Sequence, residues 1–342
     1  MSPNPLVGAV IVRDGKVIGE GFHAELGGLH AERAALADAA RRGEDVAGAT
    51  MYVTLEPCAH QGRQPPCSEA VIEADVARVV IASDDPTTKA AGKGPEQLRA
   101  AGIEVATLER EDEIARDARL LNQPFRKYGQ SGEPWVLLKT AMSLDGRTAT
   151  PEGASPWISG ERSRELVHVW RGECDAIAVG IGTVLADDPL LTARLGEARQ
   201  PVRVVFDTHA RLPLDSQLLA TLDEAPVTVV HGPEADAARV EALLRAGAET
   251  IAVGGATPVD RVRPALAGLG RRGLTSLLLE GGATLAAAFA AAEQVDEARV
   301  FVAPLLLGGP LPDVPVAGVQ GALVEARAVG EDTLIRTRFK EW

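Results

Sequence analysis

The sequence predicts an α/β protein made of two domains. Short runs rich in valine and isoleucine alternate with segments of helical spacing in both halves of the 342-residue chain, and a polar break near residue 130 interrupts this alternation. Hydrophobic residues make up 46% of the chain and charged residues 24%, which is ordinary for globular proteins and sufficient for two cores.

The first half begins with a hairpin, because Asp14-Gly15 is a turn signal between two apolar runs. The first helix is expected to stop at Gly43, and a third strand to end at Glu56-Pro57-Cys58. The expected strands cover residues 6–12, 16–21, 50–55, 78–82 and 103–106, and the expected helices cover residues 30–42, 68–74 and 97–101.

The second half repeats the alternation after a polar segment from Asn122 to Pro134, which we interpret as the domain junction. We therefore predict domains at residues 1–130 and 131–342. The expected strands of the second domain cover residues 135–140, 176–179, 202–206, 227–230, 276–279 and 298–302, and the expected helices cover residues 161–171, 235–246 and 284–292.

Charge and cysteine usage exclude several functional classes. The formal net charge of −13 disfavours binding to extended nucleic acid, and no run of apolar residues is long enough to span a membrane. Three cysteines are too few for a disulfide framework, and the first residues lack the features of a signal peptide. We expect a cytoplasmic protein that acts on a small molecule.

A zinc-deaminase pattern is the most informative feature of the first half. His30-Ala-Glu32 is followed by Pro57-Cys58 and by Cys67. Two thiolates and one imidazole hold zinc with a fourth position open for water, and a nearby carboxylate can transfer the protons of a hydrolytic deamination. The known pattern is H-x-E followed by P-C-x-x-C; here eight residues, 59–66, separate the two cysteines.

Each of these residues alone has a plainer interpretation. His30 is also consistent with a surface histidine, and cysteines often serve as small buried hydrophobes. The joint pattern favours the zinc site over both. Cys174 has no such neighbours and is interpreted as a buried residue beside a strand.

The first half resembles the RibD family of bifunctional riboflavin biosynthesis proteins. The resemblance lies in Pro3-Asn-Pro-Leu-Val-Gly, in Gly21-Phe-His23, in His30-Ala-Glu32, and in the run from Val53 to Cys67, whose longer insert between the cysteines is typical of this family. It implies a cytidine-deaminase-like αβα sandwich acting on a diaminopyrimidinone that bears a phosphoribosylamino group. It also implies a helix before Pro3. This chain begins close to that run, so either its start is truncated or its sheet is covered in another way.

The resemblance assigns roles residue by residue. It implies that His30, Cys58 and Cys67 bind zinc and that Glu32 is the proton donor. The implied substrate contacts are Asn4, His23, His60 and Arg63; for Arg63 a solvated loop residue is an equal alternative.

The second half carries a further set of motifs. These are Leu138-Lys-Thr-Ala-Met-Ser-Leu-Asp-Gly-Arg147, the run from Asp175 to Pro189, Phe206-Asp-Thr208 and Leu279-Glu-Gly-Gly-Ala-Thr-Leu285. Glycines at 281 and 282, where a strand meets a helix, would let backbone amides approach a pyrophosphate, although a plain tight turn has the same signature. Gly180-Ile-Gly182 lacks the third glycine of a Rossmann fingerprint, because Leu185 stands there, and we reject that interpretation.

The order of these motifs resembles the reductase half of the same family, which has a dihydrofolate-reductase-like fold. The resemblance implies NADPH-dependent reduction of the ribosylamino side chain to ribitylamino, by hydride delivery to the sugar C1 of an opened, imine-like form. NADPH rather than NADH is not distinguished by the residues themselves, although the turn from Thr208 to Arg211 suits a 2′-phosphate.

The implied cofactor positions are Ala141, Trp157, Thr183, Asp187, Thr208, Gly282, Ala283, Thr284, Leu285, Ala286, Ala287 and Ala288. The implied substrate positions are Ser155, Arg171, Leu191, Arg194 and Glu280. Arg171 and Arg194 suit a bidentate phosphate clamp, with surface salt bridges as the alternative. Trp157 is also consistent with a core aromatic residue, and Asp187 with a turn.

Two rival functions conflict with features of the sequence. A nucleoside or nucleic-acid deaminase with an unrelated second domain conflicts with the charge and with the cysteine spacing. A non-catalytic protein conflicts with the presence of all four deaminase residues. The family also implies a homo-oligomer, dimer or tetramer.

Overall fold

The computed structural model describes residues 2–61, 64–88, 90–149, 157–196, 199–308 and 318–342. The chain divides into two compact units, Met1–Gly132 together with Trp342, and Glu133–Glu341. In the described part of the chain, no helix has both the length and the apolar character needed to cross a membrane.

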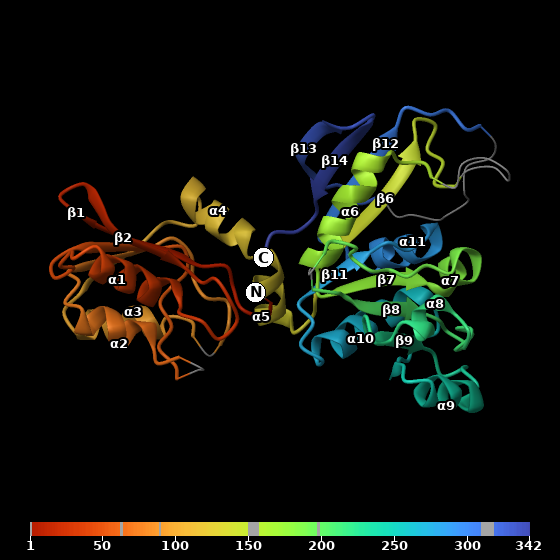
Figure 1. Ribbon diagram of the computed structural model, residues 1–342, viewed down its shortest axis with the longest axis horizontal. Helices are drawn as coiled ribbons and strands as arrows, with labels where there is room; N and C mark the ends of the chain where they lie inside the picture. The colour runs from red at the N-terminus through yellow and green to blue at the C-terminus, as the bar shows by residue number, and fades with distance from the viewer. Residues whose placement is uncertain (1, 62–63, 89, 150–156, 197–198, 309–317) are drawn as a thin grey trace. The chain divides into compact units, whose positions relative to one another are not determined.

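Unit 1 contains a five-stranded sheet in the order β2-β1-β3-β4-β5 (Figure 1). β1 (Gly8–Arg13) runs antiparallel to β2 (Lys16–Phe22) and to β3 (Thr50–Val53), whereas β3, β4 (Arg78–Ile81) and β5 (Glu104–Thr107) are parallel. The helices of this unit are α1 (Ala31–Arg41), α2 (Cys67–Glu73), α3 (Lys93–Ala100), α4 (Glu113–Leu121) and α5 (Gln123–Ser131).

One face of this sheet forms the core of unit 1. Alternate residues of the strands, such as Ile11, Met51 and Val79, pack against Ala35 of α1 and Leu98 of α3. Because side chains alternate between the two faces of a strand, these residues all lie on the face that α1 and α3 cover.

Helix α1 lies directly on the backbone of β2. A Cβ at Gly19 would lie 2.6 Å from the carbonyl oxygen of Ala35, and one at Gly21 would lie 2.4 Å from the Ala35 nitrogen. Only glycine permits this approach, which places the start of α1 beside the end of the hairpin.

The opposite face of the sheet carries an apolar hollow of about 660 Å³. Val10, Phe22, Tyr52 and Val80 contribute to its lining, together with Ile114 of α4. The described residues leave Phe22 68% exposed in this hollow. The described residues therefore leave this face of the unit 1 sheet partly uncovered.

Unit 2 contains a nine-stranded sheet in the order β10-β9-β8-β7-β11-β6-β12-β14-β13. Its seven parallel strands are β6 (Trp135–Ser143), β7 (Ala176–Gly180), β8 (Val202–Phe206), β9 (Val227–His231), β10 (Glu249–Ala252), β11 (Ser276–Leu279) and β12 (Glu297–Ala303). The hairpin of β13 (Ala322–Val329) and β14 (Asp332–Arg338) continues the sheet antiparallel to β12. The helices are α6 (Glu161–Glu173), α7 (Ile181–Asp187), α8 (Gln217–Ala220), α9 (Ala237–Arg245), α10 (Pro258–Gly270) and α11 (Ala283–Ala291).

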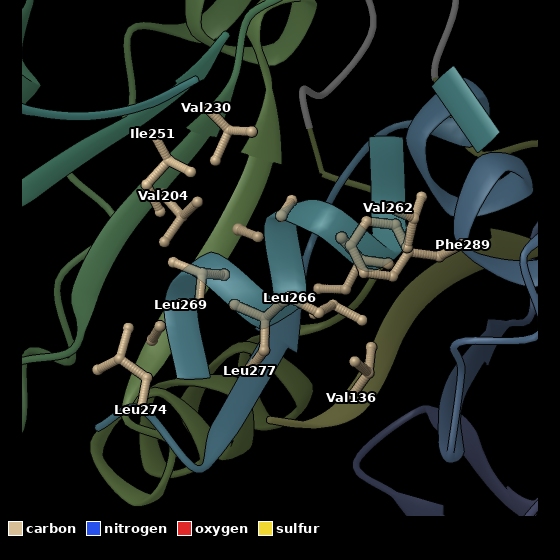
Figure 2. Packing of buried hydrophobic residues seen from close by; sticks show 14 of the residues in the cluster. Val136, Val204, Val230, Ile251, Val262, Leu266, Leu269, Leu274, Leu277 and Phe289 are labelled. Atoms are coloured by element: carbon tan, nitrogen blue, oxygen red, sulfur yellow. The ribbon is translucent and has the colours of Figure 1, made fainter. Parts of the chain in front are cut away.

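Both faces of the central strands of unit 2 are buried. Ala178 and Val204 join a cluster with α10 and α11, whereas their neighbours Val179 and Val205 join a second cluster on the other face. Figure 2 shows the first cluster, in which Leu266 and other residues of α10 lie against the sheet. Burial on both faces explains why these strands appear in the sequence as continuous apolar runs.

Most of the polar segment from Asn122 to Pro134, which we interpret as the domain junction, is helical. Residues 123–131 form α5, with Pro124 in its first turn and Gly132 in a left-handed conformation at its end. Proline in the first turn is a helix start signal, and glycine just after the last residue is a helix stop signal. The two signals therefore bound a single helix.

Candidate functional site

The predicted zinc ligands converge at two helix starts in unit 1. His30 precedes α1, Cys67 is the first residue of α2, and Cys58 follows β3. The His30 Nδ1 atom lies 3.5 Å from the Cys58 Sγ atom and 3.3 Å from the Cys67 Sγ atom. Ser68 holds Cys58 in place, because its backbone N–H and its hydroxyl both donate to the Cys58 carbonyl.

These three side chains fit a zinc ion. The three ligand atoms all lie within 4.8 Å of one another. Tetrahedral coordination with ordinary Zn–N and Zn–S bonds places nitrogen and sulfur about 3.6 Å apart. The observed nitrogen–sulfur distances of 3.3 and 3.5 Å are close to this value. Two thiols and one imidazole are also the donor set that zinc prefers in deaminases.

The electrostatics of the cluster favour a thiolate. Hydrogen bonds from Cys67 and His30 outweigh the effect of burial and lower the pKa of the Cys58 thiol to about 4. The pKa of His30 is raised, chiefly by its hydrogen bond with Cys58. Metal binding requires such a deprotonated sulfur.

Glu32 lies on the first turn of α1, two residues after His30, and is only 3% exposed. Burial raises the pKa of its carboxyl group above the ordinary value. A carboxyl group in this position lies beside the zinc ligands and is shielded from bulk water, as a proton-transfer group requires.

The predicted substrate residues of unit 1 are partly brought together. Asn4 Nδ2 lies 3.0 Å from His23 Nε2, and the rings of His23 and His30 are 5.1 Å apart. The Asn122 side chain, bonded to both the N–H and the carbonyl of Leu6, fixes the segment that carries Asn4. His60 is exposed on the loop between the cysteines, and Arg63 lies outside the described residues.

The second site lies at the carboxyl edge of the parallel strands of unit 2, where α/β sheets bind ligands. Gly281 and Gly282 connect β11 to α11, and Gly282 leaves the first turn of this helix without a side-chain cap. A Cβ at Gly282 would meet no atom within 4 Å, so the helix start is open to an approaching group. Uncapped amides at a helix start fit the pyrophosphate of a dinucleotide. Within the predicted range from Gly282 to Ala288, only the amides that precede Leu285 are available for this, because the Leu285 and Ala286 amides donate to the Gly282 carbonyl.

A buried ion pair lies next to this helix start. Arg171 on α6 donates from Nε and Nη2 to the two carboxylate oxygens of Glu280, at 2.7 and 2.9 Å. The side chains are only 14% and 9% exposed. Burial alone would raise the pKa of Glu280, but the charge and hydrogen bonds of Arg171, together with the charges of Lys139 and His168, outweigh it and the pKa is lowered. Arg171 is therefore engaged within the protein, and its interpretation as a surface salt bridge does not hold.

The Arg171 side chain also orders the segment that carries two other predicted substrate residues. The Thr192 carbonyl oxygen lies 3.2 Å from Arg171 Nη1 and 3.2 Å from His168 Nδ1. On either side of Thr192, the buried Leu191 and the exposed Arg194 have φ angles of 56° and 48°, which side chains rarely adopt. The contacts of Arg171 and His168 with the Thr192 carbonyl oxygen hold this strained segment in place.

The remaining predicted cofactor residues lie at separate points of unit 2. Ala141 lies in β6, Thr183 in α7, and Asp187 is the last residue of α7. Thr208 accepts a hydrogen bond from Arg261 at 3.1 Å. Trp157 is 60% exposed and stacks against Arg164, so its alternative interpretation as a core aromatic is wrong; Ser155 lies outside the described residues.

Three residues near these positions were not singled out from the sequence. Lys139 is partly buried beside Glu280 and Arg171, and its withdrawal from water lowers its pKa. A lysine in an otherwise apolar strand was the available signal. The sequence showed no comparable signal for His168 and Arg261, because their partners lie in distant parts of the chain.

Comparison with known proteins identifies the family of each unit. Residues 1–83 match the family model for the cytidine and deoxycytidylate deaminase zinc-binding region, and residues 134–335 match the model for the RibD C-terminal domain. The combination defines a zinc-binding deaminase fused to a reductase.

Relatives match both units at once. The chain is 41% identical over 345 residues to riboflavin biosynthesis protein RibD of Actinobacillus pleuropneumoniae, covering 98% of this chain and 89% of the relative. It is 40% identical to RibD of Escherichia coli, covering 90% and 83%. The structure of Acinetobacter baumannii RibD superposes with a TM-score of 0.85 at 38% identity, covering 99% and 94%.

A Thermotoga maritima structure, described as a diaminohydroxyphosphoribosylaminopyrimidine deaminase and 5-amino-6-(5-phosphoribosylamino)uracil reductase, superposes with a TM-score of 0.82 at 35% identity, covering 99% and 93%. The chain belongs to the RibD family. It is a bifunctional deaminase and reductase of riboflavin biosynthesis, with a zinc-binding deaminase domain and an NADPH-dependent reductase domain.

Proposed function

We propose that this chain deaminates 2,5-diamino-6-(5-phosphoribosylamino)pyrimidin-4(3H)-one and then reduces 5-amino-6-(5-phosphoribosylamino)uracil to the ribitylamino product. The observation that carries the proposal is the convergence of His30, Cys58 and Cys67 beside the buried Glu32. The deaminase and reductase activities named for the Thermotoga maritima structure support the choice of substrates.

In the deaminase site, His30, Cys58 and Cys67 hold the zinc ion. A zinc ion held by these residues would supply an activated water at neutral pH. Glu32 takes one proton from the attacking water and delivers it to the ring nitrogen, and then takes the second proton of the same oxygen and delivers it to the departing ammonia. Asn4 and His23 orient the pyrimidine, together with His60 and Arg63.

In the reductase site, the start of α11 and the positions Ala141, Trp157, Thr183, Asp187 and Thr208 hold the cofactor. NADPH bound there would supply the hydride for reduction of the ribosylamino side chain. Arg171 and Glu280 lie at the substrate position, and Arg194 binds the phosphate of the substrate. Ser155 and Leu191 are also assigned to the substrate position. The chain's contribution is mainly to orient the two reactants.

The domains are proposed as residues 1–130 and 131–342, and the protein as a cytoplasmic homo-oligomer, a dimer or a tetramer, without nucleic-acid partners. The net charge of −13 supports the absence of nucleic acid. The absence of disulfides among three free cysteines is consistent with the cytoplasm.

A paired assay tests the two activities on one sample. Ammonia release from the diaminopyrimidinone is followed with and without a zinc chelator, and NADPH oxidation is then measured. We expect ammonia release that the chelator abolishes, followed by NADPH consumption. Ammonia release without NADPH consumption would limit the function to the deaminase. One zinc per chain without ammonia release would contradict the proposed substrate.

A further inference from the structure

Strands β6 and β12 extend beyond the end of β11, the neighbouring strand that leads to Glu280 (Figure 1). β11 pairs with β6 as far as Leu138, whereas β12 pairs with β6 as far as Ser143. Residues 139–143 of β6 therefore project past β11 by roughly 16 Å, at about 3.3 Å per residue. This two-stranded extension lies at the carboxyl edge of the sheet and includes Ala141, one of the proposed cofactor positions.

The carboxylate of Asp145 joins the two segments that follow these strands. The amide of Leu307 donates to Asp145 Oδ1 at 3.1 Å, and the amide of Gly308 donates to Asp145 Oδ2 at 2.7 Å. Nearby, the backbone N–H of Leu144 donates to the carbonyl oxygen of Leu305 at 2.9 Å. Both oxygens of one carboxylate therefore bind the chain that follows β12 to the turn that follows β6.

The turn around Asp145 holds this carboxylate in place. The Ser143 hydroxyl donates to Asp145 Oδ1 at 2.5 Å and accepts a hydrogen bond from the Arg147 amide at 3.0 Å. Gly146 has a φ angle of 78°, which glycine adopts readily, and its amide donates to the Ser143 carbonyl. The hydrogen bond from Ser143, followed by those from the two amides after β12, lowers the pKa of Asp145 below its ordinary value. The group is therefore held as the charged acceptor that both amides require.

Burial of apolar side chains contributes little to this connection. Leu144 is 64% exposed, Leu305 is 38% exposed and Leu306 is 78% exposed. Exposed leucines gain little from packing, so the two segments depend on their hydrogen bonds. Hydrogen bonds to a charged group are stronger than those between neutral groups. The Asp145 carboxylate is therefore the main connection between the described parts of these segments.

We propose that Asp145 is a positioning residue of the reductase site. Its carboxylate fixes the ends of β6 and β12 relative to each other, and so holds the extension with Ala141 in the geometry that binds the nicotinamide cofactor. Asp145 acts through these strands and does not itself contact the cofactor. This proposal rests on the cofactor position proposed above for Ala141.

NADPH titration of the full-length, zinc-loaded protein tests the proposal. Asp145→Asn keeps the shape of the side chain but presents an NH2 group to one of the two amides, so only one of these hydrogen bonds survives. The Kd for NADPH, measured without the pyrimidine by quenching of tryptophan fluorescence, should rise about tenfold. In the reductase assay the KM for NADPH should rise by a similar factor, while kcat changes by less than about twofold.

Asp296→Asn is the matched control, because it perturbs the opposite end of the same two strands. Asp296 lies just before β12, and its Oδ2 atom accepts the Val136 amide at 2.7 Å. Because Asp296 is fully buried, its replacement should lower the melting temperature at least as much as Asp145→Asn does. The Kd for NADPH should nevertheless stay that of the unchanged chain, since this end of the strands lies away from the carboxyl edge.

Ser143→Ala is a milder variant that decides the question if Asp145→Asn does not fold. It removes the hydroxyl that donates to Asp145 and leaves both amides bonded to the carboxylate. The Kd for NADPH should rise about threefold, as expected for the loss of one hydrogen bond.

The outcomes separate this proposal from the proposed function. Unchanged NADPH affinity in Asp145→Asn, or in Ser143→Ala if only that variant folds, would overturn the positioning role. An equal loss of affinity in Asp296→Asn would also overturn it, because the effect would then follow general stability. The expected affinities without NADPH oxidation when the pyrimidine is added would count against the proposed substrate and still support the role of Asp145.

Discussion

Replacement of Arg171 by methionine would leave Glu280 buried without its partner. The ion pair has two hydrogen bonds of 2.7 and 2.9 Å, and both side chains are largely withdrawn from water. Removing one partner of such a pair costs about 3 kcal/mol or more, because the other charge stays buried. For a unit of this size the melting temperature should fall by roughly 6–12 °C.

The loss should depend on pH in a defined direction. In the unchanged protein the pKa of Glu280 is lowered, so its contribution to stability is present above the ordinary carboxyl pKa of about 4.3 and is lost as the pH falls through the lower folded value. Without Arg171, burial would raise the pKa of Glu280. The unfolding free energy of the variant should therefore recover as the pH falls from 7 towards about 4.5.

Urea unfolding followed by tryptophan fluorescence at pH 7 and pH 4.5 measures both effects, because Trp135 and Trp170 report on unit 2. Glu280→Gln combined with Arg171→Met is the matched control, since it removes the buried charge as well. The double variant should be more stable at pH 7 than Arg171→Met alone. Equal destabilisation at both pH values, or no gain in the double variant, would refute the reasoning.

Three further perturbations have defined outcomes. Cys67→Ser should reduce zinc content below one per chain and abolish ammonia release, while NADPH oxidation with the deaminated substrate persists; retained zinc and ammonia release would count against the ligand assignment. Gly21→Ala should destabilise unit 1 by about 1–3 kcal/mol, because the added Cβ would lie 2.4 Å from a backbone nitrogen of α1, and an unchanged melting temperature would show that α1 can move away. Asp145→Asn should speed hydrogen exchange at residues 307–308, whose amides both donate to the Asp145 carboxylate; unchanged exchange would show that other contacts hold this loop.

The parts of the fold that follow local patterns could be predicted from the sequence. The parallel strands are apolar runs because both of their faces are buried, and the zinc ligands have a characteristic spacing. The cytidine-deaminase-like and reductase folds expected from the resemblance are confirmed by the family models and by the superposed structures.

Other elements could not be predicted because their sequences contradict local rules. Helix α10 contains Pro264 and Gly268, and this glycine is needed because a Cβ there would lie 2.9 Å from Ile251. The hairpin of β13 and β14 is partly exposed and lacks an apolar run, so the last thirty residues showed no usable pattern.

The candidate sites were predictable to different degrees for a similar reason. The deaminase residues lie close together in the sequence, whereas Arg171 and Glu280 are 109 positions apart and meet only in the fold. The sequence therefore marked both residues but not their pairing, and it could not show that Arg171 is already bonded to Glu280 and Thr192.

Glu32→Gln tests the central claim most directly, because it removes the proton-transfer group and leaves all three zinc ligands. The measurement is ammonia release from the diaminopyrimidinone, made alongside zinc content on the same sample. The account predicts one zinc per chain with ammonia release reduced about 100-fold or more. Ammonia release close to that of the unchanged protein, with zinc still bound, would contradict the assignment of Glu32 and the deaminase mechanism built on it.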